Sequence, residues 1–181
     1  MVSEEEIERE KQRAAAVAAE LVEDGMTVGL GTGSTAAYLL EPLAARKLNI
    51  RCVATSPSTA QAARVMGIEV VSFAGLEAPP RVDITIDGAD QVDPSGWLIK
   101  GGGGAHTREK AVAASADRFV VIVSANKLVD RLTPPVPLEL AEFLSQMPGV
   151  VEHGLFPPDM VADVLVGRGD EVERIAVAGR G

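Results

Sequence analysis

The sequence predicts an α/β protein: a Rossmann-like three-layer sandwich in which helices cover both faces of a mostly parallel central sheet. Two observations lead to this prediction. Short apolar strands rich in β-branched residues alternate with helical segments along most of the chain, as in βαβ units. In addition, a strand at 26–30 runs directly into the glycine-rich turn 31–35 and then into an apolar helix, an order typical of parallel sheets that bind a ligand.

The first element is a helix that begins at a capping box. Ser3 stands at the N-cap and Glu6 follows three residues later, before an alanine-rich amphipathic run that reaches residue 22. We expect Gly25 to end this helix as a C-cap. The strand 26–30 and a helix over 36–45 come next, on either side of the glycine turn.

The same alternation continues through the rest of the chain. We expect a turn with part of a strand at 149–156 and a polar tail that frays at 167–181. The other predicted strands are 50–54, 69–73, 81–86, 118–124 and 162–166, and the other predicted helices are 58–66, 107–114 and 138–147.

Length and composition restrict the classes of function. A chain of 181 residues suits one domain, 1–181, and buries roughly 70% of its unfolded surface. Only 3% of the residues are aromatic and the formal net charge is −9, which argues against a nucleic acid as partner. A small phosphorylated ligand is compatible with this charge, because a local group of backbone N–H donors can be positive within an acidic surface.

The single cysteine and the acidic N-terminus suggest a cytoplasmic protein. Cys52 is the only cysteine, lies in a predicted strand and is expected to be a small core residue. A signal peptide would be basic at its start and then apolar, whereas the first residues of this chain are acidic. No apolar run approaches the length of a membrane span. We therefore expect no contact with a membrane.

The turn 31–35 has the residues of an anion-binding site. Glycines leave backbone N–H donors unobstructed, and Thr32, Ser34 and Thr35 add short hydroxyls beside the start of a helix. The sequence of the turn matches neither the dinucleotide fingerprint nor the Walker pattern. The alternative is a tight strand-to-helix turn that uses glycine for its geometry alone.

Residues 87–110 concentrate acids, bases and bare backbone between two predicted strands. They include three carboxylates (Asp87, Asp90, Asp93), Lys100, the four glycines 101–104 and then Glu109 between two cationic residues. We interpret this stretch as the wall of an active site, since a strand end and a glycine loop bring side chains and N–H groups to one crevice. The alternative is that 87–90 and 93–96 are two surface turns and 101–104 a mobile loop.

Six strings in order resemble the ribose-5-phosphate isomerase type A family. They are GLGTGSTA at 29–36, TSPST at 55–59, DGAD at 87–90, KGGGGA at 100–105 with REK at 108–110, SANKLVD with Lys127, and PGVVEHGLF at 148–156. The resemblance covers residues 11 to about 138 and again 147–166.

The resemblance implies reversible conversion of ribose 5-phosphate to ribulose 5-phosphate through an enediolate, with neither a metal nor an organic cofactor. Glu109 resembles the family's general base, and Asp87, Asp90 and Lys100 resemble the groups that open the sugar ring and stabilise the enediolate oxygen. We expect a homodimer. The implied substrate contacts are Lys11, Gly31, Thr32, Gly33, Ser34, Thr35, Ser56, Gly88, Ala89, Gly101, Gly102, Gly103 and Lys127.

The chain departs from the family pattern at 138–148, where most of a small α+β lid domain is missing. Closure over the substrate and part of the subunit contact could depend on that domain, so one alternative is an inactive scaffold that has lost its lid. A second is a non-catalytic sugar-phosphate sensor on the same kind of fold, which would keep the anion turn. A third, which fits the KGGGGA and REK strings less well, is a related isomerase or deaminase that acts on hexosamine phosphates. His106 and His153 are expected to be surface or packing residues, since two histidines do not form a metal cluster.

Overall fold

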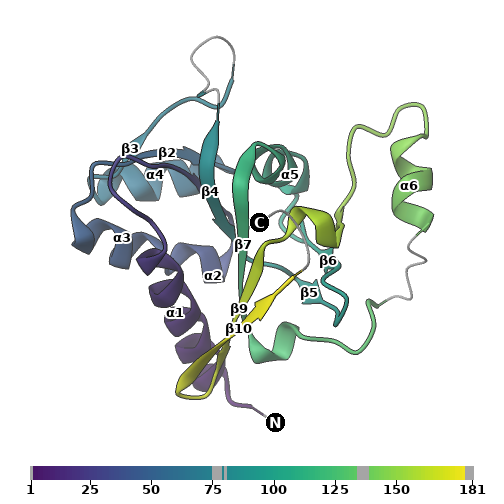
Figure 1. Cartoon of the computed structure of the whole chain (residues 1–181), viewed down its shortest axis with the longest axis horizontal. Helices are drawn as coiled ribbons and strands as arrows, with labels where there is room; N and C mark the ends of the chain where they lie inside the picture. The colour runs from purple at the N-terminus through teal and green to yellow at the C-terminus, as the bar shows by residue number, and fades with distance from the viewer. Residues whose placement is uncertain (1, 75–78, 80, 134–138, 178–181) are drawn as a thin grey trace.

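The computed structural model describes residues 2–74, 79, 81–133 and 139–177. Its centre is a seven-stranded sheet in the order β10-β9-β7-β4-β1-β2-β3, and only the pairing of β9 with β10 is antiparallel (Figure 1). The predicted fold class is confirmed. The strands are β1 Thr27–Leu30, β2 Arg51–Ala54, β3 Glu69–Val70, β4 Val82–Asp87, β7 Ala116–Ser124, β9 Asp163–Arg168 and β10 Glu171–Ala176.

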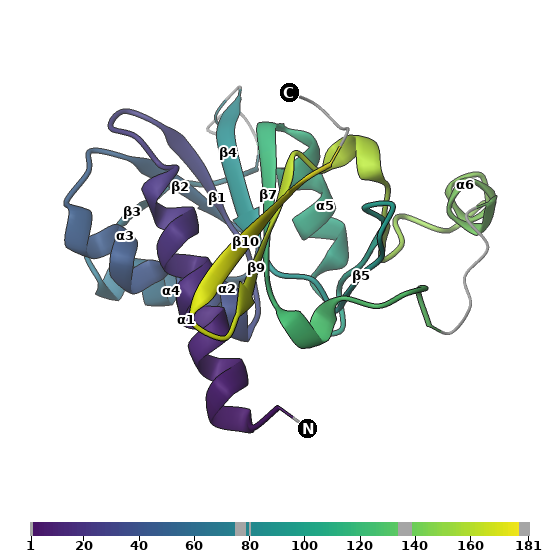
Figure 2. The same cartoon turned by 60° about the horizontal axis from the view of Figure 1, so that its bottom comes forward.

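Helices cover one face of this sheet, and a helix with a second, smaller sheet covers the other (Figures 1 and 2). Helix α6 (Glu139–Ser145) lies at the periphery beside the smaller sheet. The first face carries α1 Glu4–Glu20, α2 Ser34–Ala37, α3 Leu40–Arg46 and α4 Pro57–Val65. The second carries α5 His106–Ala114 and the strands β5 Gln91–Val92, β6 Leu98–Ile99 and β8 Leu155–Phe156. Two 3₁₀ helices are η2 Ala125–Lys127 and η3 Pro158–Met160.

Strand β7 is buried on both faces, which explains why its residues 119–123 are all apolar. Val120 and Ile122 pack toward the alanine-rich face of α1, whereas Phe119, Val121 and Val123 pack against the smaller sheet. Both faces of the strand are therefore buried, as expected for the middle of a doubly covered parallel sheet. Cys52 is fully buried in the first of these cores, which confirms its predicted place, and burial raises the pKa of its thiol to about 12.

The parallel strands bring three distant segments to one edge of the sheet. Leu30 at the end of β1 pairs with Ile86 of β4, and Asp87 at the end of β4 pairs with Val121 of β7. The segments that follow these strands, which start at Gly31, Gly88 and Ala125, leave the sheet at its carboxyl edge, where ligands bind in open α/β sheets.

Several predicted boundaries were wrong. The tail did not fray at 171–176, because β10 pairs along its whole length with β9; residues 178–181 lie outside the described residues. The helix expected at 36–45 begins at Ser34 and is divided into α2 and α3. Helix α1 begins at the predicted Ser3 cap but ends at Leu21, four residues before Gly25.

Other predicted elements are shorter than expected. Only Glu69–Val70 of 69–73 and Leu155–Phe156 of 149–156 pair as strands. Helix α6 covers Glu139–Ser145 of the predicted 138–147. The hairpin of β5 and β6 was not predicted, because each of its strands contributes only two residues to the pattern.

Within the described part of the chain, none of the helices is long and apolar enough to cross a membrane.

Candidate functional site

A pocket opens at the carboxyl edge of the sheet, where the segments after β1, β4 and β7 meet the start of α5. Its lining comes from five separate parts of the chain, which only the fold brings together. The lining residues are Thr32, Gly33, Ser34, Thr35, Gly88, Ala89, Asp90, Lys100, Gly101, Gly102, Gly103, Glu109 and Lys127, and each of them was named as a site residue from the sequence.

Asp87 lies just beneath the pocket and joins its two halves. One carboxylate oxygen, Oδ1, accepts hydrogen bonds from the backbone N–H of Gly88 (2.7 Å) and of Thr32 (3.1 Å). Gly31 makes room for this carboxylate, because a Cβ at that position would lie 2.0 Å from Oδ1. Asp87 therefore fixes the glycine turn after β1 relative to the strand end of β4.

The Lys100 ammonium lies between two carboxylates. Its Nζ is 3.0 Å from Asp87 Oδ2 and 3.3 Å from Glu109 Oε2, and it also donates a hydrogen bond to the carbonyl of Gly88. All three side chains are almost completely buried. Two negative charges thus share one positive charge inside the protein, an arrangement with a net charge of −1 when all three groups are ionised.

This arrangement raises the pKa of both carboxyl groups. Burial raises the pKa of Asp87, and the nearby Lys100 charge only partly opposes the rise. Burial also raises the pKa of Glu109, and the Asp87 charge raises it further. Asp87 Oδ2 and Glu109 Oε2 lie at ion-pair distance from Lys100. Among the described residues, however, neither atom has a partner with the geometry of a hydrogen bond. Such unsatisfied oxygens beside a pocket are typical of a functional site rather than of a structural ion pair.

The glycine loop 101–104 is ordered by its neighbours. The N–H of Gly102 donates to Asp90 Oδ2 (2.9 Å), and the N–H of Gly104 donates to the carbonyl of Gly101 (2.8 Å). Gly101 has φ +90°, a conformation that residues with a Cβ rarely adopt. The loop is followed by α5, whose first turn carries Glu109.

The turn after β1 forms the opposite side of the pocket. Gly33 has φ +112° and precedes α2, so the hydroxyls of Ser34 and Thr35 enter the pocket lining from the start of that helix. The Thr32 and Thr55 hydroxyls lie 2.6 Å apart, and the hydroxyl of Thr59 donates to the carbonyl of Gly31 (3.0 Å). Thr59 belongs to the string TSPST, but it was not among the predicted site residues, and it acts by holding the glycine turn rather than by lining the pocket.

Four of the predicted site residues do not line the pocket. Gly31 and Asp87 lie directly behind it, as described above. Lys11 forms an ion pair with Glu8 of its own helix (2.6 Å), and Ser56 caps α4 by accepting a hydrogen bond from the N–H of Thr59 (3.1 Å). Ser56 lines a neighbouring surface depression that also contains Gly103 and Arg108.

The two turns considered in the sequence have different roles. Asp93 holds the hairpin between β5 and β6, where its Oδ1 accepts from the N–H groups of Ser95 and Trp97 (each 3.0 Å). The segment 93–96 is therefore an ordinary turn, and Asp93 does not join the pocket. The segment 87–90 instead supplies its backbone and carboxylates to the site.

Comparison with known proteins gives the family of the chain. The family model described as ribose 5-phosphate isomerase A (phosphoriboisomerase A) matches residues 51–144, more than half of the chain. A ribose-5-phosphate isomerase A from Natronomonas pharaonis is 39% identical, over 92% of this chain and 96% of the relative. The chain belongs to the ribose-5-phosphate isomerase A family. The resemblance read from the six strings is confirmed.

Other relatives in the family are longer than this chain. A ribose-5-phosphate isomerase A from Roseobacter denitrificans is 46% identical over 90% of this chain, but the match spans only 61% of the relative. With the relative from Caulobacter the match spans 58% of its length. The chain therefore spans about three fifths of the length of these curated relatives.

Solved structures of the family share the fold closely. The ribose 5-phosphate isomerase A from Neisseria gonorrhoeae has a TM-score of 0.87 and 25% identity, and covers 98% of this chain. That from Methanocaldococcus jannaschii has a TM-score of 0.84 and 31% identity, and covers 93%. In both cases the match includes 99% of the solved chain.

A second family model matches the N-terminal half. It is described as the DeoR C terminal sensor domain and covers residues 6–90. This match includes the turn 31–35 and Asp87, but it ends before Lys100 and Glu109.

Proposed function

We propose that the protein is an aldose–ketose isomerase that interconverts ribose 5-phosphate and ribulose 5-phosphate through an enediolate. The observation that carries this proposal is the position of Lys100 and Glu109. A buried carboxylate with raised pKa and a buried ammonium lie 3.3 Å apart at one side of a pocket whose other side is a glycine and hydroxyl turn. A base, a cation and an anion-binding turn are what this reaction requires.

In this proposal Glu109 is the general base. Its carboxylate removes the proton from C2 of the open-chain aldose and returns a proton to C1, while the hydroxyl proton moves from O2 to O1. During the reaction Glu109 carries the proton taken from C2. Because its pKa is raised, Glu109 accepts this proton more readily than an exposed glutamate would. Glu109 Oε2 has no hydrogen-bond partner among the described residues, so one of its lone pairs can accept this proton.

Lys100 is proposed to stabilise the negative charge that develops on the enediolate oxygen. The ammonium is held by the carbonyl of Gly88 and by Asp87, so it does not have to reorganise when that charge forms. We propose that Asp87 and Asp90 assist ring opening and the transfer of hydroxyl protons. Asp90 lines the pocket and accepts from Gly102, which keeps it beside the glycine loop.

The turn after β1 is proposed to hold the phosphate. Gly33, Ser34 and Thr35 present backbone and hydroxyl groups to the pocket, and Lys127 adds a positive charge from η2. Binding energy at the unreactive phosphate orients the carbons at the other end of the substrate, which raises the rate of the chemical step. The other proposed contacts follow the sequence prediction, including Lys11, which must leave Glu8 to reach a ligand.

The assay is the conversion of ribose 5-phosphate to ribulose 5-phosphate by the purified chain, with glucosamine 6-phosphate as a control substrate. We expect turnover of ribose 5-phosphate only. Binding of ribose 5-phosphate without turnover would instead favour a sensor or an inactive scaffold. The sensor is the second candidate because the DeoR sensor match covers the phosphate turn, but a sensor does not need the Lys100–Glu109 pair that lies outside that match.

We also propose that residues 1–181 act as a single α/β domain in which 138–148 replaces the lid domain. In support, the alignment with the Natronomonas pharaonis relative runs over 222 residues, more than this chain contains, so that relative has residues without a counterpart here. A homodimer and a cytoplasmic location complete the proposal. Light scattering of the purified chain tests the first, and cell fractionation tests the second.

A further inference from the structure

Residues 152–156 contact Lys100 and also Lys110, the residue that follows Glu109, without lining the pocket. They form part of the string PGVVEHGLF, for which the reaction gives no role. The segment lies between β6, which leads to Lys100, and α5, which carries Glu109. Its contacts with these two elements are of different kinds.

Backbone contacts fix the segment to Lys100. The N–H of Lys100 donates to the carbonyl of Gly154 (2.9 Å), and the adjacent residues Ile99 and Leu155 pair in the smaller sheet. A Cβ on Gly154 would lie 2.5 Å from the carbonyl oxygen of Lys100, so only glycine allows this approach. The position of the Lys100 backbone therefore depends on this segment.

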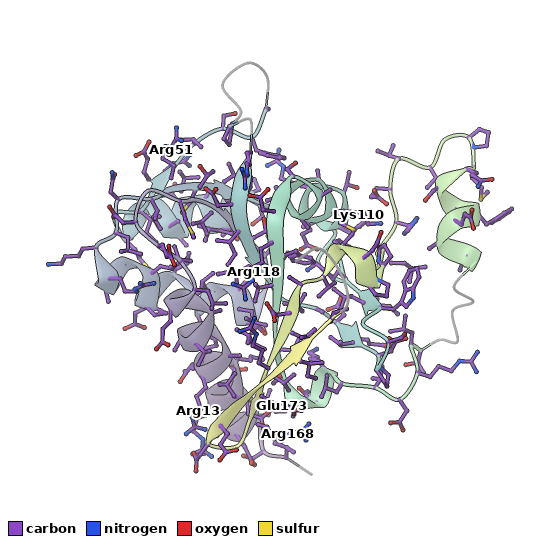
Figure 3. The ribbon with its side chains drawn as sticks, viewed as in Figure 1. Arg13, Arg51, Lys110, Arg118, Arg168 and Glu173 are labelled. Carbon is purple, nitrogen blue, oxygen red and sulfur yellow. The ribbon has the colours of Figure 1, made fainter. Side chains whose placement is uncertain are left out.

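Side-chain contacts fix the same segment to α5. Lys110 directly follows Glu109 and extends from α5 toward the C-terminal part of the chain (Figure 3). Its Nζ lies 2.6 Å from Glu152 Oε1 and 3.2 Å from His153 Nδ1. Burial lowers the pKa of Lys110, and the hydrogen bond to Glu152 opposes that shift.

Phe156 lies between the two lysines. The centre of its ring is 4.9 Å from Lys110 Nζ and 5.5 Å from Lys100 Nζ, distances at which an aromatic face attracts a cation. The ring is fully buried and also contacts Phe119 of the central sheet. Because both ammonium groups lie close to this one ring, the position of Phe156 is linked to that of Lys100 and of Lys110.

His153 connects this arrangement to α6. Its Nδ1 accepts from Lys110 and from the N–H of Leu155 (3.3 Å), so the ring proton is on Nε2, which donates to Ser145 Oγ (3.1 Å). Ser145 Oγ in turn donates to the carbonyl of Ala141 (2.9 Å). Because Nε2 carries a proton in this arrangement, His153 is not a base for Ser145, and the contact is a structural link rather than a nucleophilic pair.

We propose that residues 152–156 are a positioning element that sets the distance between Lys100 and Glu109, with Glu152 and His153 acting on Glu109 through Lys110. This inference rests on the proposed isomerase function. None of these groups touches the reacting atoms. The Gly154 carbonyl holds one member of the pair and the Lys110 side chain holds the helix that carries the other.

The test replaces Glu152 by glutamine and measures both turnover and the titration of Glu109. We expect kcat to fall about 10- to 100-fold with KM for ribose 5-phosphate unchanged, since the phosphate turn is not altered. We also expect the ¹³C NMR titration midpoint of the Glu109 carboxylate, assigned with Glu109→Gln, to fall because a loosened α5 admits water. Glu173→Gln is the matched control, because Glu173 makes an exposed ion pair with Arg168, and neither residue lines the pocket; both lie away from Lys110 (Figure 3).

The two measurements separate this inference from the function on which it rests. If the wild-type chain does not isomerise ribose 5-phosphate, the proposed function fails and the Glu109 midpoint alone decides the positioning role. If it does, a midpoint that stays or rises in Glu152→Gln, or an unchanged kcat, overturns the proposal. Should Glu152→Gln not fold, His153→Leu carries the same expectations, with His153→Gln, which restores a donor and an acceptor, as its rescue.

Discussion

Substituting Glu109 by glutamine removes one of the two carboxylates that share the Lys100 ammonium. The side chain keeps its size, so the change is mainly one of charge. A positioned general base contributes about 10²–10⁴-fold to a rate, or about 3–5 kcal/mol of activation free energy. We therefore expect Glu109→Gln to lose most turnover while it still binds ribose 5-phosphate, because the turn 31–35 is unchanged.

The same substitution should stabilise the folded chain. Glu109 and Asp87 are two buried carboxylates beside one ammonium, so one negative charge is not compensated, and leaving a buried group uncompensated costs about 1–3 kcal/mol or more. Burial and the Asp87 charge raise the pKa of Glu109 in the folded state. A raised carboxyl pKa gives stability that is full below the unfolded pKa and is lost as pH rises through the folded value. The gain in Glu109→Gln should therefore be largest at pH 8 and small near pH 4.

Urea unfolding and turnover of the same protein samples check both expectations. The free energy of unfolding of Glu109→Gln should exceed that of the wild type by about 1–3 kcal/mol at pH 8, or about 2–4 °C in Tm for each kcal/mol. The matched control is Glu173→Gln, whose ion pair is exposed. A near-normal rate would remove Glu109 from the role of base, and a destabilised variant at pH 8 would refute the electrostatic reasoning.

Three further predictions concern the same site. Gly31→Ala should lower both activity and Tm, because its Cβ would meet Asp87 Oδ1 at 2.0 Å; a fully active variant would show that Asp87 need not stay where it is. Lys100→Met should abolish turnover and cost about 3–5 kcal/mol of unfolding free energy at pH 8. The loss should become smaller as the pH falls, since burial raises the pKa of both Asp87 and Glu109 and protonation removes the charges that Lys100 compensates; a loss independent of pH would contradict this. In the wild type, kcat/KM should fall as pH drops through a value above the ordinary glutamate pKa of 4.5, since burial and Asp87 raise the pKa of Glu109; an acid limb at or below that value would be inconsistent with the buried base.

The sequence predicted the fold class and the pocket lining because both depend on local patterns. Strand 118–124 is apolar without alternation, which indicates burial on both faces, and the glycine turn with Ser34 and Thr35 has a composition that few other structures require. The family strings then placed Lys100 and Glu109 in one site. Nothing in these patterns depends on contacts between distant side chains.

The parts that were missed depend on such contacts. The strand 171–176 is polar and exposed on one side, and it forms because β9 offers an edge for antiparallel pairing. Lys11 forms an ion pair with Glu8 three residues before it, which a motif match does not reveal. The network of Lys110 with Glu152 and His153 joins residues more than 40 positions apart, and no spacing in the sequence predicts it.

The most direct test of the account is a structure of the chain bound to phospho-erythronic acid, the compound named with a solved D-ribose-5-phosphate isomerase that is 29% identical to this chain. We predict that the phosphate contacts the N–H and hydroxyl groups of Gly33, Ser34 and Thr35, and that the carboxylate at the other end lies beside Lys100 and Glu109. A phosphate bound away from that turn, or a ligand that does not reach from the turn to Glu109, would contradict the proposal that both belong to one site.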